Sequence, residues 1–364
     1  MGEFLFMADA HIRSRTWTNS MQLNGDAYAA LTKVAGQLPG SVDSLIIGGD
    51  WFDSNRPSSE DLVRTLEFLR GFSSVSYVRG NHDSCVPSFL EALSAWDGGG
   101  VRELTADAGT TGTCQCRGVS WLPSADGLRE QILRARDMMN PFRPLYLVLH
   151  ASFKHLLGFD GAYQLDAEWI KDTFKDRCVR VLVGDIHTRN TLELPNGGWI
   201  HSPGSLYPRS WDKVQEPCCV SLVDSDTGEI RDVPCDVRRY VQLEYAGQPE
   251  LIKELQRISE EHEDGMLDTF VRVVVPDGAP PLPRTSVPHV QLQSVLDVHE
   301  DAVQVGDDDP SWSATRDATL LQALLDECGD DKDLADMASA LVASDDPLKE
   351  IEQWLNYWKV ERIA

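Results

Sequence analysis

The sequence is short of positive charge. Its 364 residues include 33 Lys and Arg against 58 Asp and Glu, which gives a formal net charge of −25 at pH 7. Proteins that hold nucleic acid by its phosphates usually carry a basic surface, and this chain as a whole does not. A polyanionic substrate would therefore have to be held by bound metal ions, by local arginines or by a partner subunit. Net charge bears on binding and solubility, and it leaves the fold open.

Long apolar runs and paired cysteines are also missing. No apolar stretch approaches the roughly 20 residues that span a bilayer, and the start, Met1 to Phe4, lacks the basic flank of a signal peptide. The eight cysteines are scattered without a CxxC pair, which supports neither a zinc knuckle nor a disulfide framework. We therefore expect a cytoplasmic protein without membrane association.

What the chain does have, up to about residue 235, is an alternation of apolar runs with amphipathic helical patterns. Such runs, rich in β-branched residues, are typical of strands covered on both faces. Later runs predict hairpin strands, with Asp226-Thr227-Gly228 as a turn. We predict a layered α/β sandwich. Its first strands are expected at Glu3–Ala8, Ser44–Gly48, Val75–Arg79, Leu145–Leu149 and Val179–Val183.

The pattern changes after residue 237, and we predict four segments: a core of residues 1–237, a small α/β capping domain at 238–297, an acidic linker at 298–311 and a helical segment at 312–364. In the second segment a strand, a helix opened by Pro249 and another strand are expected. The last segment has apolar stripes at helical spacing. They would either fold back on the chain or dock into a groove of a partner.

Five short polar clusters follow the predicted strands. They are Asp9-Ala10-His11, Gly49-Asp50-Trp51-Phe52-Asp53, Gly80-Asn81-His82-Asp83, His150 and Gly184-Asp185-Ile186-His187. Carboxylates, imidazoles and an amide are the ligands that hold two divalent metals around a phosphate. A single histidine is more often structural, but five such clusters in order favour metal-assisted phosphoester hydrolysis.

Seven of these groups are enough for two ions that share one carboxylate: Asp9, His11, Asp50, Asn81, His150, Asp185 and His187. Asp9 and His11 are two residues apart, so at the end of a strand both side chains would point the same way. Gly48 and Gly49 allow a tight turn that leaves Asp50 placed to bridge two ions. His82 could protonate the leaving oxygen, with Asp83 orienting its ring.

In this order, the clusters resemble the calcineurin-like metallophosphoesterases. Within that superfamily, Gly49–Asp53 followed by Arg56-Pro57 resembles the nuclease subunit of bacterial SbcCD complexes and its phage and eukaryotic relatives. Ser202-Pro203-Gly204-Ser205 is similar to a turn of that family, and Arg238-Arg239-Tyr240 to the entry of its capping domain. The resemblance covers roughly residues 3 to 275.

The resemblance implies which group does what. One metal would be bound by Asp9, His11, Asp50 and His187, and the other by Asp50, Asn81, His150 and Asp185, with His82 as the catalytic histidine. Two Mn²⁺ ions are implied, and Mg²⁺ also suits oxygen donors. The implied activity is that of a 3′–5′ double-strand exonuclease and single-strand endonuclease in DNA repair and recombination. An SMC-like coiled-coil ATPase would dock on the C-terminal helices, and the nuclease would form a homodimer.

One cluster departs from the family pattern, because the usual GHxH is here Gly184-Asp185-Ile186-His187. Asp185 can still bind a hard cation, but it adds negative charge and has a shorter reach. Two other hypotheses stay open: the acidic net charge favours hydrolysis of a small-molecule or protein phosphoester, and Asp185 motivates a non-catalytic scaffold with a degenerate site. Arg189 and Arg209, near the last cluster, would either clamp a phosphate or form ordinary surface ion pairs.

Overall fold

A computed structural model of the chain describes residues 2–16, 23–84, 88–96, 100–107, 110–111, 114–140, 143–154, 165–276 and 287–296. Almost all of them belong to one compact unit, formed by Met1–Val275 and Pro280–Val295. The predicted linker at 298–311 and the predicted helical segment at 312–364 lie outside the described residues.

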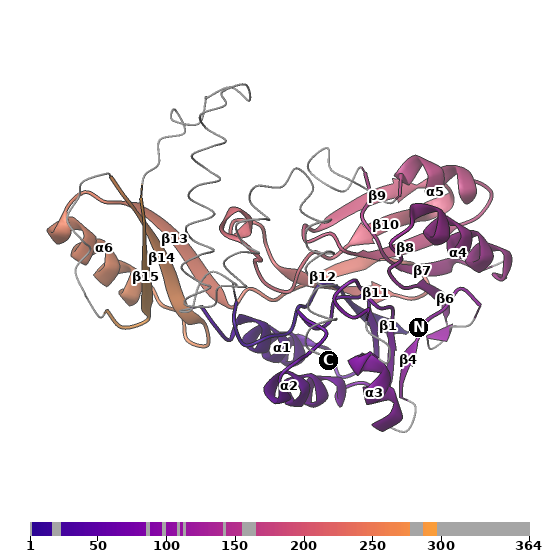
Figure 1. The fold of residues 1–364 in the computed structure, drawn as a ribbon, viewed down its shortest axis with the longest axis horizontal. Helices are drawn as coiled ribbons and strands as arrows, with labels where there is room; N and C mark the ends of the chain where they lie inside the picture. The colour runs from indigo at the N-terminus through magenta and orange to yellow at the C-terminus, as the bar shows by residue number, and fades with distance from the viewer. Residues whose placement is uncertain are drawn as a thin grey trace, which may run out of the picture. The chain divides into compact units, whose positions relative to one another are not determined.

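Two six-stranded sheets form the centre of the described chain (Figure 1). The first has the order β12-β11-β1-β2-β3-β4, in which β1 to β4 run parallel and β11 and β12 are antiparallel to their neighbours. Its strands are β1 (Glu3–Met7), β2 (Ser44–Ile47), β3 (Ser74–Tyr77), β4 (Val101–Glu103), β11 (Cys219–Asp224) and β12 (Ile230–Pro234).

The second sheet has the order β5-β6-β7-β8-β10-β9, with four parallel strands between two antiparallel edges. Its strands are β5 (Thr110–Thr111), β6 (Cys114–Val119), β7 (Leu145–His150), β8 (Val179–Gly184), β9 (Asn190–Leu194) and β10 (Gly198–Ser202). All six residues of β7 and all six of β8 are buried, as expected for strands covered on both faces.

Three buried apolar clusters form the core: one lies between the two sheets, and the other two lie between each sheet and the helices on its outer face. Phe4 and Phe6 of β1 belong to an inter-sheet cluster that also contains Tyr146 of β7. Leu5 and Met7, the alternate residues of the same strand, belong to the cluster on the helix side of the first sheet. This alternation follows from the period-two geometry of a strand and fixes the layered packing.

Helices cover the outer faces of both sheets. They are α1 (Asp26–Gln37), α2 (Ser59–Leu69), α3 (Phe89–Trp96), α4 (Ala125–Asp137) and α5 (Ala167–Thr173), with short 3-10 turns at Pro195–Gly197 and Trp211–Lys213. A capping box between Ser58 and Asp61 begins α2, and Ser124 and Asp166 cap α4 and α5. Across the residues that the structure describes, no helix is both long and apolar enough to cross a bilayer.

A third, three-stranded sheet follows the core. It consists of β13 (Arg238–Glu244), β14 (Leu267–Val275) and β15 (Val290–Leu296), with α6 (Gln248–Glu260) between the first two. The helix buries Leu251, Leu255 and Ile258. The predicted strand-helix-strand order is present here, and β15 is an additional strand. The division between a core ending at 237 and a capping domain remains a prediction.

The predicted fold class is confirmed. The five predicted first strands correspond to β1, β2, β3, β7 and β8, each within one residue or two of its expected bounds. The predicted turn joins β11 to β12, with Gly228 at a φ of +77°. Because the strands within each sheet's centre are parallel, their carboxyl ends lie along one edge of the sheet, which is where the polar clusters follow them.

Candidate metal centre

The predicted ligands lie on strained backbone. Asp9, His11, Asp50 and Asp185 have φ angles of 50°, 41°, 49° and 79°, a region that residues other than glycine seldom adopt. Such strain costs of the order of 1–3 kcal/mol per residue and persists where the surrounding structure enforces it. Four strained residues, all predicted ligands, therefore mark this edge of the sheets as a functional site.

The strain also corrects one expectation. Asp9 and His11 do not continue β1 as extended strand, so period-two geometry does not explain their convergence. Instead the Asp9 and His11 N–H groups donate to the carbonyl oxygens of Gly49 and Asp50, which ties their loop to the loop after β2. The close approach requires glycine at position 49, since a Cβ there would lie 2.3 Å from His150 Nδ1.

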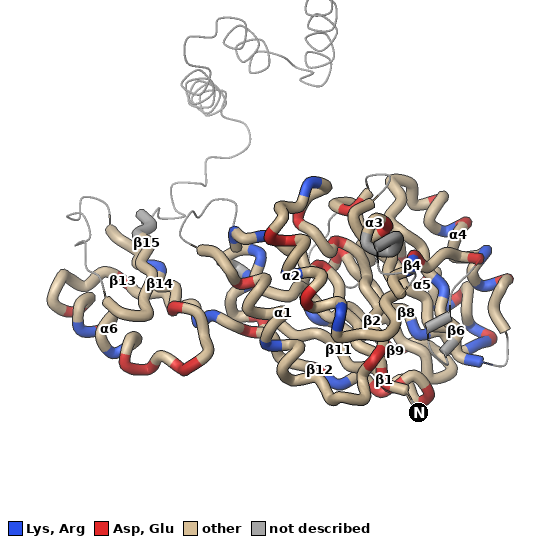
Figure 2. Tube along the Cα trace, turned by 90° about the horizontal axis from the view of Figure 1, so that it is seen from below, with Lys and Arg blue, Asp and Glu red and all other residues tan. Residues whose placement is uncertain are grey.

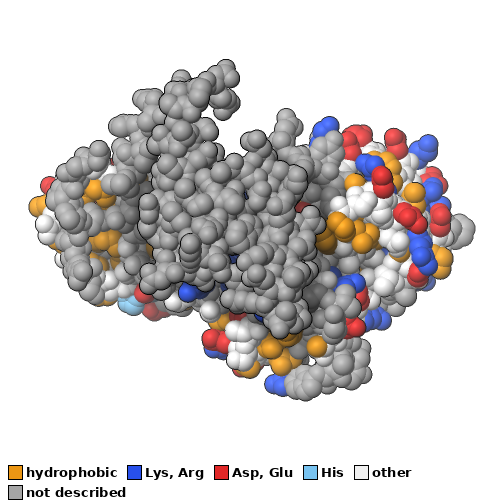
Figure 3. Space-filling model, in the orientation of Figure 1, with side chains coloured by type: hydrophobic (Ala, Val, Ile, Leu, Met, Phe, Trp, Pro, Cys, Tyr) orange, Lys and Arg blue, Asp and Glu red, His pale blue; other side chains and the backbone are white. Residues whose placement is uncertain are grey.

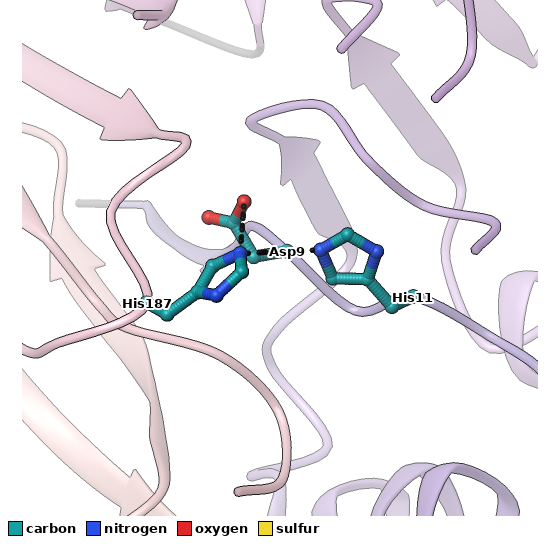
Figure 4. A group of neighbouring side chains, drawn as sticks. All are labelled: Asp9, His11 and His187. Carbon is teal, nitrogen blue, oxygen red and sulfur yellow. Dashed lines mark hydrogen bonds and ion pairs between the residues drawn. The ribbon is translucent and has the colours of Figure 1, made fainter. Parts of the chain in front are cut away.

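The first predicted donor set lies together in the structure. Figure 4 shows His187 beside Asp9 and His11, with 3.7 Å between His187 Nε2 and Asp9 Oδ1 and 3.3 Å between the Nε2 atoms of His187 and His11. His11 Nε2 is also 3.7 Å from Asp50 Oδ2. Ligands about 2.1 Å from an octahedral ion are separated by about 3 Å when they are adjacent, so these spacings suit one cation.

The second predicted set surrounds His150 Nε2. Asn81 Oδ1 lies 3.0 Å away, Asp50 Oδ2 3.5 Å and Asp185 Oδ1 3.8 Å. His150 Nδ1 is 2.9 Å from the Gly48 carbonyl oxygen, which can only accept, so Nδ1 carries the proton. The lone pair of Nε2 is therefore directed at the other three donors, in the tautomer that binds metals.

Asp50 joins the two sets. Its Oδ2 lies between 3.5 and 3.9 Å from the Nε2 atoms of His11, His82 and His150, while its Oδ1 accepts the His82 N–H. The structure thus brings all seven predicted ligands into one cluster around a shared carboxylate. Three overlapping groups of potential ligand atoms within 4.8 Å of one another, Asp9-His11-His187, His11-Asp53-His82 and Asp9-Asp50-His150, describe the same cluster.

The electrostatics of this cluster are those of a cation site. Burial, then the charges of Asp50 and Asp185, raise the pKa of Asp9 well above its usual value, and burial raises that of Asp50 to about 6. Burial, then the charge of Arg209, lowers the pKa of His187 to about 4. The uncharged forms of these carboxyl and imidazole groups are thus favoured, and divalent cations would stabilise the ionised carboxylates while binding the neutral imidazoles.

His82 lies on the open side of the cluster. Its side chain is 36% exposed, whereas those of Asp9 and His150 are fully buried. Its Nδ1 lies 2.5 Å from the carbonyl oxygen of Asp53, which leaves Nε2 facing the cluster. The ring is therefore oriented by Asp53, whereas the predicted orienting group was Asp83.

Asp83 has a different role in the structure. Its Oδ2 accepts the N–H groups of Trp51 and Gly80, and its Oδ1 accepts that of Phe52. Burial, then the charge of Asp50, raises its pKa to about 6. Asp83 thus joins the loop after β2 to the loop after β3, and it acts on the backbone that carries the predicted ligands. Trp51 of the same loop is fully buried and bonded to Thr65, so it is a core residue.

Asp53 is a supporting residue for which the sequence suggested no role. Its Oδ2 accepts from Arg13 Nη1 and its Oδ1 from Arg209 Nη2, both at 2.6 Å, and Oδ1 also faces His11 Nδ1 at 3.4 Å. Burial would raise its pKa, but the contacts with His11, Arg209 and Arg13 outweigh burial and hold the pKa well below its usual range. Its place in the Asp50 cluster, three residues on, was the signal available in the sequence.

The two predicted phosphate-binding arginines both have carboxylate partners. Arg209 forms an ion pair with Asp53 and also donates to the Tyr207 hydroxyl at 2.6 Å, and only 16% of its side chain is exposed. Arg189 Nε is 2.7 Å from Asp232 on β12. A direct contact of either residue with substrate remains a prediction.

The family model that describes the calcineurin-like phosphoesterases matches residues 2–214, more than half of the chain and the whole of this centre. The chain belongs to the calcineurin-like phosphoesterases. As a member of this family it is a metal-dependent hydrolase of phosphoesters, and the donor cluster at the ends of the strands is where its metals would bind.

Two curated proteins are similar to this phosphoesterase over most of its length. The DNA double-strand break repair protein Mre11 of Haloferax volcanii is 26% identical over 270 residues, covering 71% of this chain and 58% of the relative. The protein of the same name from Sulfurisphaera tokodaii is 22% identical over 259 residues, covering 65% and 64%. The chain thus spans about three fifths of the length of these relatives.

A solved structure is also similar to part of the chain. The crystal structure of TT1561 of Thermus thermophilus, 14% identical, covers 64% of this chain and 99% of that protein with a TM-score of 0.43. With so low a score this likeness adds nothing to the assignment, which depends on the family model and on the geometry of the centre.

Proposed function

We propose that this phosphoesterase is a two-metal DNA nuclease that uses Mn²⁺, with 3′–5′ exonuclease activity on duplexes and endonuclease activity on single strands. The single observation that carries the proposal is the paired donor set around Asp50, with His82 on its exposed side. Two metals held about 3.5–4 Å apart activate a water and stabilise the oxygens of an in-line displacement.

The chain's own residues supply the remaining parts of the reaction. Since Nδ1 of His82 bonds to the Asp53 carbonyl oxygen, its Nε2 can hold the proton that the leaving oxygen takes up. The buried Asp9, Asp50 and His150 fix the donors, while the partly exposed His82, Asp185 and His187 border the side from which a substrate would enter.

The names of the two curated relatives support DNA as the substrate, because both are double-strand break repair proteins. The acidic composition is less of an obstacle than the whole-chain charge suggests. Residues 297–364 contain 18 Asp and Glu but 5 Lys and Arg, so they account for 13 of the 25 net negative charges. On the described part, Lys and Arg are interspersed with Asp and Glu (Figure 2), as they are around α4 and α5 on the face drawn in Figure 3.

The test is digestion of end-labelled duplex and single-stranded DNA with and without Mn²⁺. His82→Ala should abolish cleavage, because Nε2 is lost as proton donor, and should bind Mn²⁺ with wild-type stoichiometry in calorimetry. Full activity of this variant would contradict the proposal. Exposed His289 lies in the turn that precedes β15, and His289→Ala is the matched histidine control that should retain cleavage.

A second candidate keeps the centre and changes the substrate to a small-molecule or protein phosphoester, which the net charge of −25 favours. Turnover of a small phosphodiester without any degradation of DNA would establish this candidate. The scaffold hypothesis, motivated by Asp185, predicts fewer than two Mn²⁺ ions bound per chain in the same calorimetric titration.

The partner and the location complete the proposal. We propose an SMC-like coiled-coil ATPase that binds residues 312–364, a homodimeric nuclease, and a cytoplasmic site of action. No disulfide joins the cysteines whose side chains the structure describes, which suits a reducing compartment. Co-purification of the full chain and a chain ending at 311 with the ATPase of the same source tests the docking site, since only the full chain should be retained.

A further inference from the structure

A buried ion pair joins the third sheet to the first helix. Arg238, the first residue of β13, donates from Nη2 to Asp26 Oδ2 at 2.9 Å and from Nε to Asp26 Oδ1 at 2.9 Å. The two side chains are 2% and 0% exposed. The Tyr240 hydroxyl donates to Asp26 Oδ1 at 3.0 Å, so two residues of β13 depend on one carboxylate at the start of α1.

The same carboxylate is connected to the loop after β1. Thr16 Oγ1 donates to Asp26 Oδ2 at 2.5 Å, and Thr16 itself is buried. The Thr16 carbonyl oxygen accepts from Arg13 Nη2 at 2.9 Å, and Arg13 Nη1 donates to Asp53 Oδ2 at 2.6 Å. Asp26 therefore holds the segment that aims Arg13 at Asp53.

Asp53 is the last connection before the metal centre. Its carboxylate faces the Nδ1 atom of His11, a predicted ligand, and its carbonyl oxygen is bonded to Nδ1 of His82. The steps from Arg238 to these two histidines are polar contacts, two of them through the backbone carbonyl oxygens of Thr16 and Asp53, and they pass from buried side chains to the partly buried Arg13 and Asp53. Charged contacts with little solvent around them are stronger than those at a surface.

We infer that Arg238 is a positioning residue for the metal centre. It acts through Asp26, Thr16, Arg13 and Asp53, so the anchoring of the third sheet sets the placement of His11 and His82. The inference concerns hydrolysis and metal binding at the proposed centre and does not depend on DNA as the substrate. A purely structural ion pair would stabilise the fold without affecting either property beyond the loss of folded protein.

The test compares Arg238→Met with Arg180→Met. Arg180 is also a buried arginine, but it lies near the start of β8, whereas the metal centre lies at the end of that strand. It donates to the Tyr146 hydroxyl and to the carbonyl oxygens of Ser225, Asp226 and Thr227. Both variants are assayed well below their melting temperatures on bis(p-nitrophenyl) phosphate with saturating Mn²⁺. This small diester does not reach from the centre to β13, so DNA contacts of the third sheet cannot enter the result.

We expect Arg238→Met to lower kcat about tenfold with KM within about twofold of wild type, because small displacements of catalytic groups reduce rates steeply. We expect Mn²⁺ affinity to fall about threefold or more, as when a group supporting a metal ligand is lost. Arg180→Met should leave both quantities unchanged. Equal effects of the two variants, or none from Arg238→Met, would overturn the inference.

A double-mutant cycle with Arg13→Met tests the route. If Arg238 acts through Arg13, the double variant should be no worse than Arg13→Met alone, whereas multiplied effects would overturn the inference. Should Arg238→Met fail to fold, Tyr240→Phe removes only one hydrogen bond to Asp26 and is expected to lower kcat and Mn²⁺ affinity about twofold. Unchanged kcat and Mn²⁺ affinity in folded Tyr240→Phe would then overturn the inference. A wild type that binds Mn²⁺ but hydrolyses neither DNA nor the diester would contradict the proposed function, and the Mn²⁺ titrations would still decide the inference.

Discussion

Replacing Asp53 by Asn tests whether a residue that supports the metal centre, without being one of its predicted ligands, affects metal binding and turnover. Asp53 is no predicted ligand, yet its carboxylate lies among Arg13, Arg209 and His11, with a side chain only 17% exposed. The substitution preserves size and removes one negative charge. The Asn side chain keeps one oxygen acceptor. Its NH₂ group would face either an arginine guanidinium or the His11 imidazole, and these groups are donors too, so one hydrogen bond is lost.

The magnitude follows from the two bonds of 2.6 Å to Arg13 and Arg209. Hydrogen bonds to charged groups contribute about 1.5–3 kcal/mol each, and Asn retains one of them. We expect a loss of about 2–3 kcal/mol in the free energy of unfolding, which in a chain of this size lowers Tm by roughly 5 °C. Because the pKa of Asp53 is held below its usual range, this contribution is fully present above about pH 4 and is lost as the pH falls further.

The functional effect should exceed the loss of stability. Without the carboxylate, His11 loses the negative group that faces its Nδ1, and we expect Mn²⁺ affinity or diester turnover to fall about 10- to 100-fold. Calorimetric Mn²⁺ titration and turnover at 20 °C measure both. Asp232→Asn is the control, since Asp232 pairs with Arg189 at 2.7 Å outside the centre and should cost less than about 1 kcal/mol. Asp53→Asn with Mn²⁺ affinity and turnover within twofold of wild type would refute the supporting role.

Three further predictions concern the same fold. Gly184→Ala should weaken Mn²⁺ binding in calorimetry, because its Cβ would lie 2.1 Å from the Gly48 carbonyl oxygen, whereas Gly36→Ala, with nothing within 4 Å, should not. Burial, then the charge of Arg189, lowers the pKa of buried His201 to about 4. The free energy of unfolding, measured with urea, should therefore fall by up to about 3 kcal/mol as the pH drops from 6.5 to 4, and His201→Asn should not show this loss. The pKa of Asp50 is raised to about 6, so without metal its contribution to stability is present below about pH 4 and is lost above pH 6. The rise in Tm on adding Mn²⁺ should therefore be larger at pH 8 than at pH 5. Equal rises at the two pH values would contradict this prediction.

The sequence predicted the strands well because apolar runs such as those of β7 and β8 are buried along their whole length. It also predicted which residues would meet, since polar groups that follow parallel strands share one edge of a sheet. The pairing of the two sheets and the strand β15 were beyond reach, because periodicity within a strand carries no information about its neighbours across long stretches of chain.

Within the centre, the convergence of the predicted ligands could be predicted from the sequence, whereas the residues that support them could not. The positive φ angles of Asp9 and His11 arise from hydrogen bonds to the loop after β2, about forty residues away in the chain, and no local pattern reports them. The same holds for Asp83, whose bonds run to the backbone of that loop, and for Arg13, whose partners are Thr16 and Asp53. Contacts that close over such distances depend on the assembled sheets.

The charge of the centre shows what Asp185 changes. Asp53 is offset by two arginines, so the predicted ligands contribute the negative charges of Asp9, Asp50 and Asp185. Two divalent cations would bring four positive charges and leave one in excess, whereas a histidine at position 185 would leave two. One excess positive charge still attracts a phosphodiester, which carries a single negative charge per phosphate. With two cations bound, Asp185 would therefore lower the attraction for anions without removing it, and its carboxylate would strengthen the hold on the second cation, which is compatible with a working metal centre.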